Sequence, residues 1–189
     1  MRKPLGPREE ALTGQQPFWE EKLSTIPEMF GEEPSEPAVK AEILALKPDT
    51  GEEVWSIPRD ELTWASPVCV NTGSRMELIL AGNSTASSYD PETGTRLWSV
   101  KCLDGEVAPS AAYANGMVFV ANDTPALVSG IRIADVEGQS APKPAWQKDD
   151  FRPDVASPLA TEKCVLFATS GGTLACRDPR TGDVKWSQE

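Results

Sequence analysis

The stretch Ser88–Trp98 reads SYDPETGTRLW, and its pattern occurs at two other places in the chain. Residues Ala45–Trp55 read ALKPDTGEEVW, and residues Cys176–Trp186 read CRDPRTGDVKW. In each copy a small residue comes first, Thr-Gly occupies the sixth and seventh positions, and Trp ends the unit. This recurrence indicates a repeat protein.

Each copy is predicted to be a β-hairpin with a tight turn. Proline sets a backbone φ angle suited to a turn, Gly adopts a positive φ without steric cost, and Asp and Thr side chains accept hydrogen bonds from nearby backbone N–H groups. In the copy quoted first, the arms are residues 84–90 and 96–100. The Trp beside a small residue indicates that the indole rings lie flat against small residues of a neighbouring copy.

The spacing of tryptophans predicts the architecture. Four of them recur at intervals of 43, 48 and 40 residues, namely Trp55, Trp98, Trp146 and Trp186. A period of about 40 to 50 residues with several short strands per unit is typical of an all-β protein, a β-propeller with four-stranded blades. The chain shows no sustained helical period after residue 41, which argues against a helical solenoid.

About three and a half blades are predicted within residues 42–189. The first blade contributes only two strands, at 42–47 and 53–57. The next three blades are complete, with strands expected at 65–70, 76–81, 85–89 and 96–100, then at 111–113, 117–121 and 127–133, and then at 165–169 and 173–177. Proline is tolerated at the first residue of a strand, and one proline marks the innermost strand of each complete blade, namely Pro67, Pro109 and Pro158.

Two regions depart from the repeat. The loop Asp135–Pro144 replaces the Thr-Gly turn of the third blade, and it is either a contact surface or a drifted turn without a function of its own. Residues 1–41, rich in Pro and Glu, are predicted to be an irregular arm or insertion, with a short helix at residues 19–23 as one option. A peptide that docks on a partner is the alternative for this arm.

Composition excludes several classes of function. The net charge of −11 argues against binding to nucleic acid, because nothing in the chain could neutralise a row of phosphates. The absence of histidine excludes serine-histidine and cysteine-histidine catalysis within this chain. We expect no transmembrane helix, because no window of about 20 apolar residues exists. The N-terminal MRKPLG shows neither a signal peptide nor a lipid-attachment cysteine.

The four cysteines show no metal-binding spacing. A turn at Gly171-Gly172 would place Cys176 opposite Phe167 and Cys164 on the other face of the sheet. We therefore expect no disulfide between Cys164 and Cys176, and small buried thiols at all four positions, which include Cys69 and Cys102.

The three copies resemble the tryptophan-docking repeat of pyrroloquinoline-quinone (PQQ)-like propellers, Ala-x-Asp-x-x-Thr-Gly-x-x-x-Trp. Asp90 and Asp178 match the acidic position and Lys47 departs from it, while Ser88 and Cys176 replace Ala. The resemblance covers residues 42–189 and is nearest to the BamB-like repeat proteins. It implies a partial arc of a propeller of roughly seven or eight blades. The missing blades would come from a longer chain or from self-association of copies.

The resemblance implies two classes of function. BamB-like members bind no quinone and act as scaffolds for other proteins in the bacterial periplasm or cell envelope. We expect this class, a non-catalytic protein-binding module, because packing explains the four repeated tryptophans and no adjacent cysteine pair is present. No catalytic, cofactor-binding or metal-binding residue is assigned.

The alternative is a fragment of a PQQ-dependent quinoprotein dehydrogenase, which would hold PQQ and calcium on the propeller axis. The one tight acidic cluster that could serve it is Asp149, Asp150 and Asp154. An intracellular platform of the WD-repeat kind is a third option, and the missing Trp-Asp and Gly-His dipeptides argue against it.

Overall fold

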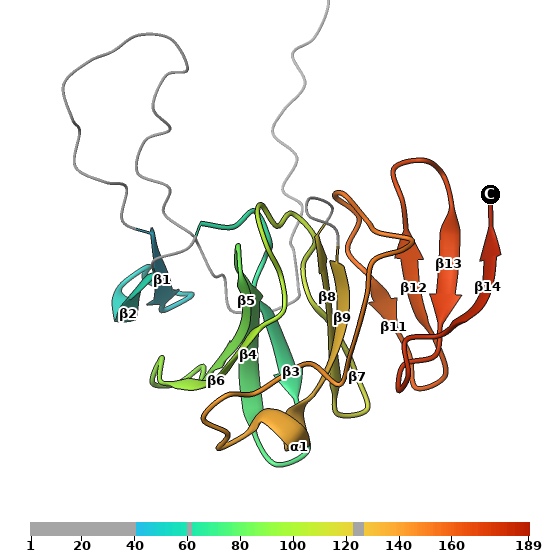
Figure 1. The fold of residues 1–189 in the computed structure, drawn as a ribbon. Coiled ribbons are helices and arrows are strands. Elements are labelled where there is room, and N and C mark those ends of the chain that lie inside the picture. The colour runs from blue at the N-terminus through green and yellow to red at the C-terminus, as the bar shows by residue number, and fades with distance from the viewer. Residues whose placement is uncertain (1–40, 60–61, 123–126) are drawn as a thin grey trace, which may run out of the picture.

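The computed structural model describes residues 41–59, 62–122 and 127–189. These residues form a two-stranded sheet followed by three four-stranded sheets, all antiparallel. Figure 1 shows the sheets side by side as an arc that runs from β1 and β2 to β14. The predicted all-β fold, a partial propeller of four-stranded blades, is confirmed. The arm at residues 1–40, with its expected helix, lies outside the described residues.

The strands of each blade follow one another in space as in sequence. The first hairpin consists of β1 (Ala41–Leu46) and β2 (Glu53–Arg59). The second sheet contains β3 (Val68–Asn71), β4 (Met76–Ala81), β5 (Thr85–Tyr89) and β6 (Arg96–Lys101). The third contains β7 (Ala112–Ala114), β8 (Met117–Asn122), β9 (Leu127–Arg132) and β10 (Trp146–Lys148). The fourth contains β11 (Leu159–Ala160), β12 (Val165–Ala168), β13 (Leu174–Arg177) and β14 (Val184–Gln188).

The hydrophobic core lies between the sheets. Every residue of β8 is buried, and so is every residue of β4 after Met76, because these strands have a neighbouring sheet on each face. One core cluster joins the second and third sheets, and another, with Phe119 and Phe167, joins the third and fourth. A smaller cluster joins the first hairpin to the second sheet through Ile43 and Leu78.

The three prolines expected to mark the innermost strand of each complete blade lie just before the first strand of each four-stranded sheet. Pro67 and Pro158 directly precede β3 and β11, and Pro109 lies three residues before β7. Serines beside these prolines link neighbouring blades: the Ser66 backbone N–H donates to Ser110 Oγ at 2.9 Å, and the Ser110 N–H donates to Ser157 Oγ at 3.0 Å. This chain of bonds was not predicted from the sequence, although a serine beside each proline was its signal.

A short helix corrects the prediction for the third blade. Helix α1 (Ile133–Val136) starts where strand 127–133 was expected to end, so it occupies the first part of the predicted loop. Ile133 and Val136 are buried in the cluster between the second and third sheets. These two apolar side chains hold the helix against the core, and residues 137–141 after it are exposed.

The prediction for the cysteines is wrong in two respects. Cys164 and Cys176 form a disulfide, with their Cα atoms 6.0 Å apart. The β12–β13 register pairs Leu166, not Phe167, with Cys176, because the connecting loop is 169–173. Cys164 therefore lies one diagonal step from Cys176 on the same face of the sheet. In addition, Cys69 is exposed, whereas Cys102 is buried as expected.

Candidate interaction surface

Neighbouring blades are joined by a tryptophan that docks on the turn of the next blade. Trp55 on β2 donates its indole N–H to the Pro91 carbonyl at 3.2 Å. Its ring lies so close to Gly94 that a Cβ there would be 2.9 Å from Trp55 Cε3. Gly94 is the glycine of the Thr-Gly turn, so the absence of a side chain makes room for the indole.

The same arrangement joins the third and fourth sheets. Trp146 donates its indole N–H to the Pro179 carbonyl at 2.9 Å, and a Cβ on Gly182 would lie 2.6 Å from its ring. Gly130, opposite Trp146 on β9, makes the other close approach to the ring. Trp146 is therefore held between a glycine of its own sheet and a glycine of the next.

This geometry refines the predicted packing of the indoles. A neighbouring blade receives the rings of Trp55 and Trp146, and the residue that each ring contacts there is the turn glycine, Gly94 or Gly182. The small residues that start the repeats instead pair across the hairpin with the Trp of the same unit, in the pairs Ala45–Trp55, Ser88–Trp98 and Cys176–Trp186.

Trp98 is anchored differently, because the third blade lacks the Thr-Gly turn. Its indole N–H donates to Glu77 Oε2 at 2.9 Å, within its own sheet. Glu77 is only 1% exposed and also accepts hydrogen bonds from Ser88 Oγ at 2.7 Å and Arg75 Nε at 3.1 Å. The role of Glu77 was not predicted from the sequence, although an acidic residue inside the apolar run MELILA was its signal.

The loop after α1 is connected to the polar contacts around Glu77. Arg75 forms a second ion pair with Glu137, at 2.8 Å. The start of the loop Asp135–Pro144 thus contacts the second sheet, and like the docking turns it connects the third and fourth strands of its own sheet. A further role of its exposed part in contact with a partner stays a prediction.

The fourth sheet ends in an uncovered apolar face. Trp186 on β14 is 46% exposed, whereas Trp146 is only 7% exposed. The ladder places Leu159, Leu166, Cys176 and Trp186 in one row across the sheet, and Leu159 is also largely exposed. No sheet of the described residues packs on this face, and β14 lies at the end of the arc in Figure 1.

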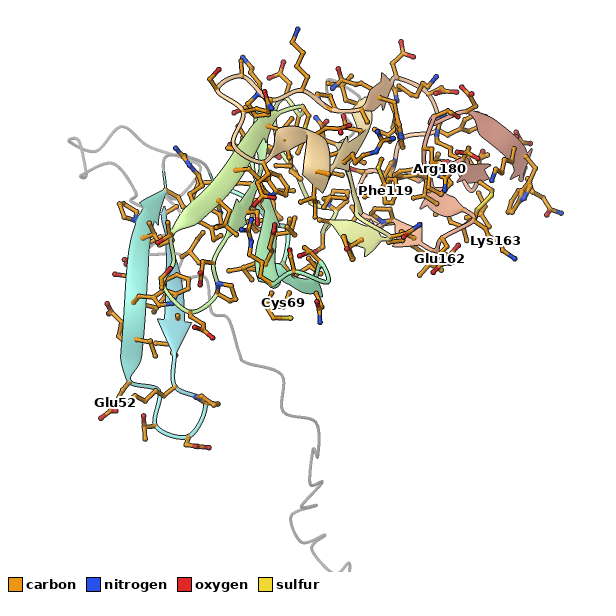
Figure 2. The ribbon with its side chains drawn as sticks, turned by 90° about the horizontal axis from the view of Figure 1, so that it is seen from below. Glu52, Cys69, Phe119, Glu162, Lys163 and Arg180 are labelled. Atoms are coloured by element: carbon orange, nitrogen blue, oxygen red, sulfur yellow. A yellow bond between two sulfur atoms is a disulfide. The ribbon has the colours of Figure 1, made fainter. Side chains whose placement is uncertain are left out.

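The first hairpin carries the matching half of the docking arrangement. Its turn, Lys47–Gly51, has the backbone hydrogen bond that closes the other docking turns, from the Gly51 N–H to the Lys47 carbonyl at 2.8 Å. Within the described residues, nothing lies within 4 Å of a Cβ built on Gly51. Figure 2 shows Glu52, next to this turn, at the tip of the hairpin and away from the other sheets. Among the described residues, the two ends of the arc thus present an undocked tryptophan and an unoccupied docking turn.

Two of the three aspartates in the predicted acidic cluster form contacts with other side chains. Asp150 accepts a hydrogen bond from the Arg177 guanidinium at 2.5 Å, and Asp154 accepts one from Ser170 at 3.3 Å. Asp149 is exposed. In the part of the chain that the structure describes, no three acidic, Cys or His side chains are positioned to hold a metal ion.

The docking turn of the fourth sheet is expected to make the free energy of unfolding depend on pH in the acidic range. A backbone hydrogen bond from Arg180 lowers the pKa of Asp178, and Lys185 lowers it further. Because the folded-state pKa is depressed, the stabilisation is present above the pKa of the unfolded chain and is lost as pH falls through the lower folded value. We expect Asp178→Asn to flatten the fall of the unfolding free energy below about pH 4, measured by urea unfolding at several pH values. An unchanged acid limb in D178N would contradict this role.

Comparison with known proteins places the chain among propellers. BamB from Moraxella catarrhalis is 13% identical over 80% of this chain and 48% of that one, with a TM-score of 0.60. The designed protein Ika8 is 16% identical over 79% of this chain and 46% of that one, with a TM-score of 0.58. Quinohemoprotein alcohol dehydrogenase ADHIIG from Pseudomonas putida HK5 is 20% identical over 69% of this chain and 21% of that one, with a TM-score of 0.50. At these identities the structures show the fold alone.

The chain thus spans about half the length of the BamB and Ika8 structures. A comparison with curated proteins gives no match. Within the described residues, no helix has the length and hydrophobicity needed to cross a membrane. Residues 39–189 match the family described as outer membrane protein assembly factor BamB, and the chain therefore belongs to that family.

Proposed function

We propose that this chain is a non-catalytic protein-binding or scaffolding module, and that the open face of its fourth sheet is a binding surface. The observation that carries the proposal is the state of Trp186, which is 46% exposed on an apolar face while Trp55 and Trp146 are docked. Large exposed aromatic side chains on an apolar patch are typical anchors of protein interfaces.

The two occupied docking sites define the chemistry of the partner. It offers a β-hairpin whose turn provides a carbonyl for the indole N–H and a glycine for the ring, as Pro91 and Gly94 do for Trp55. The turn Lys47–Gly51 has the same Pro-x-Thr-Gly sequence and is unoccupied within the described residues. A second copy of the chain is therefore the partner to which we commit, and a further blade of a longer chain is the competing occupant.

The cell envelope is the proposed location. The family to which the chain belongs is described by an outer-membrane assembly function, which supports export. The disulfide between Cys164 and Cys176 also supports it, because disulfides persist in oxidising compartments such as the bacterial periplasm.

The pairing predicts a complementation experiment. We expect the chain to self-associate in sedimentation velocity runs over a concentration series, and both Trp186→Ala and Gly51→Asn to abolish the association. Asn tolerates a positive φ, so Gly51→Asn preserves the turn while its side chain blocks the indole. An equimolar mixture of the two variants should restore a pair, because each keeps the half that the other lacks.

Trp64→Ala is the matched control, since Trp64 is 65% exposed and precedes β3, away from the fourth sheet. A monomeric wild-type chain, or equal effects of W186A and W64A, would reject the pairing of copies and leave the competing occupant. Saturable quenching of tryptophan fluorescence by PQQ with calcium would instead contradict the non-catalytic assignment and favour the dehydrogenase alternative.

A further inference from the structure

Each four-stranded sheet has one position, the acceptor position, whose side chain lies on the same face as the tryptophan of that sheet. It lies on or directly before the second strand, two residues before the residue that faces the small partner of the tryptophan across the ladder. Glu77 occupies the acceptor position in the second sheet, Met117 in the third and Cys164 in the fourth. Side chains two residues apart in a strand point to the same side, so each of the three shares the face of its own tryptophan.

The second and third sheets fill the acceptor position in opposite ways. In the second sheet, Glu77 accepts the hydrogen bond of the Trp98 indole N–H, which therefore stays in its own sheet. The third blade has no Thr-Gly turn that could receive this indole. In the third sheet, Met117 offers no oxygen, and the Trp146 indole N–H donates to the Pro179 carbonyl in the docking turn of the next sheet. A carboxylate at this position thus accompanies a retained tryptophan, and an apolar side chain accompanies a docked one.

The fourth sheet resembles the third in this respect. Cys164 forms a disulfide with Cys176, which lies directly opposite Trp186 on the ladder. Sulfur is a weak hydrogen-bond acceptor, so the disulfide cannot replace the carboxylate of the second sheet. The Trp186 indole N–H makes no hydrogen bond to any described residue, and its ring is 46% exposed. The fourth sheet therefore leaves its indole N–H available to a partner.

We propose that the residue at the acceptor position determines which sheets can bind a docking turn, and that Cys164, held in its disulfide, makes the fourth sheet one of them. An indole N–H that is removed from water needs a hydrogen-bond acceptor. Because the fourth sheet supplies none, the partner has to bring a carbonyl oxygen, as Pro91 and Pro179 do at the two occupied sites. In a second copy of the chain, the corresponding carbonyl is that of Pro48. The inference rests on the proposed function, because the ligand is the docking turn of that copy.

The test transfers the acceptor of the second sheet to the fourth. The double variant C164E/C176S introduces the Glu and Ser of the second sheet, and the added change G51N keeps copies from pairing. We expect the Trp186 indole N–H signal, assigned in ¹⁵N spectra by its loss in W186A, to shift. Its exchange with water should slow roughly tenfold or more relative to G51N alone, the factor expected for a hydrogen bond to a charged group. A signal that neither shifts nor slows would overturn the inference, whether or not copies of the chain associate.

The matched control is C164M/C176S, which also lacks the disulfide but introduces the Met of the third sheet, a side chain of similar length without an acceptor. With Gly51 intact, this control should keep the self-association measured by sedimentation velocity, whereas C164E/C176S should weaken it roughly tenfold or more. A dispersed amide spectrum shows that each variant is folded. Equal losses of association in the two variants would overturn the inference, because the disulfide and not the missing acceptor would then matter. A monomeric wild-type chain would reject the pairing of copies, and the exchange of the Trp186 N–H would still decide this inference.

Discussion

Replacing Trp146 with Ala is expected to lower the free energy of unfolding by about 3 to 5 kcal/mol. The ring is 7% exposed and contacts Gly130 and Gly182, and Phe119 lies 6.0 Å away between ring centroids. Truncation would leave a cavity between two sheets and remove the hydrogen bond to the Pro179 carbonyl. Urea unfolding followed by far-UV circular dichroism measures the change.

Two controls separate docking from the mere loss of an aromatic residue. Trp64→Ala removes a 65% exposed ring and should change the unfolding free energy by about 0.5 kcal/mol or less. Gly182→Ala and Gly138→Ala both place Ala at a positive φ, of 74° and 71°, but only the Cβ at position 182 meets the Trp146 ring. If G182A costs no more than G138A, and W146A no more than W64A, the docking account is wrong.

Much of the fold follows from local sequence, because the repeat combines turn chemistry with strand periodicity. Strands β4 (Met76–Ala81) and β5 (Thr85–Tyr89) have the predicted bounds. The Thr-Gly turns lie between β5 and β6 and between β13 and β14, as expected. In these segments the glycine that a positive φ requires and the apolar pattern of the strands indicate the same hairpin.

The predicted strand pairing was wrong where a shift of one residue in a turn changes the register of the two strands. A turn centred on Gly171-Gly172 and the observed loop 169–173 differ by one position, and that difference moves Cys164 to the face of Cys176. Helix α1 was missed because four residues are too few to show a helical period. Local patterns therefore locate a hairpin more reliably than they determine which side chains face each other across it.

The candidate surfaces could not be predicted in full from the sequence, because they are formed by contacts between residues that are far apart in the chain. Asp150 was considered as part of a calcium site, but its partner is Arg177, 27 residues away in sequence. The tryptophans were recognised as packing residues, and the exposure of Trp186 agrees with the expected partial arc, which leaves an apolar blade face without a neighbouring blade.

Replacing Glu77 with Ala is expected to cost about 2 to 6 kcal/mol of unfolding free energy, because two buried donors lose their acceptor at about 1 to 3 kcal/mol each. The buried carboxylate accepts hydrogen bonds from Trp98, Ser88 and Arg75. Its removal leaves the first two donors buried without an acceptor. Arg75 is 35% exposed, so water can replace part of its ion pair.

The variant Glu77→Gln distinguishes the role of the acceptor oxygens from that of the charge. Its amide oxygen can still accept from Trp98 and Ser88, and only the Arg75 side meets an N–H group, so we expect a loss of about 1 to 2 kcal/mol. Glu52→Ala is the control, since Glu52 pairs with Lys47 on the surface. Urea unfolding, with near-UV circular dichroism for the environment of Trp98, orders the three variants. A loss in E77A no larger than that in E52A would mean that packing alone holds Trp98. An equal loss in E77Q and E77A would instead make the negative charge the stabilising element, because the retained amide oxygen would then contribute nothing.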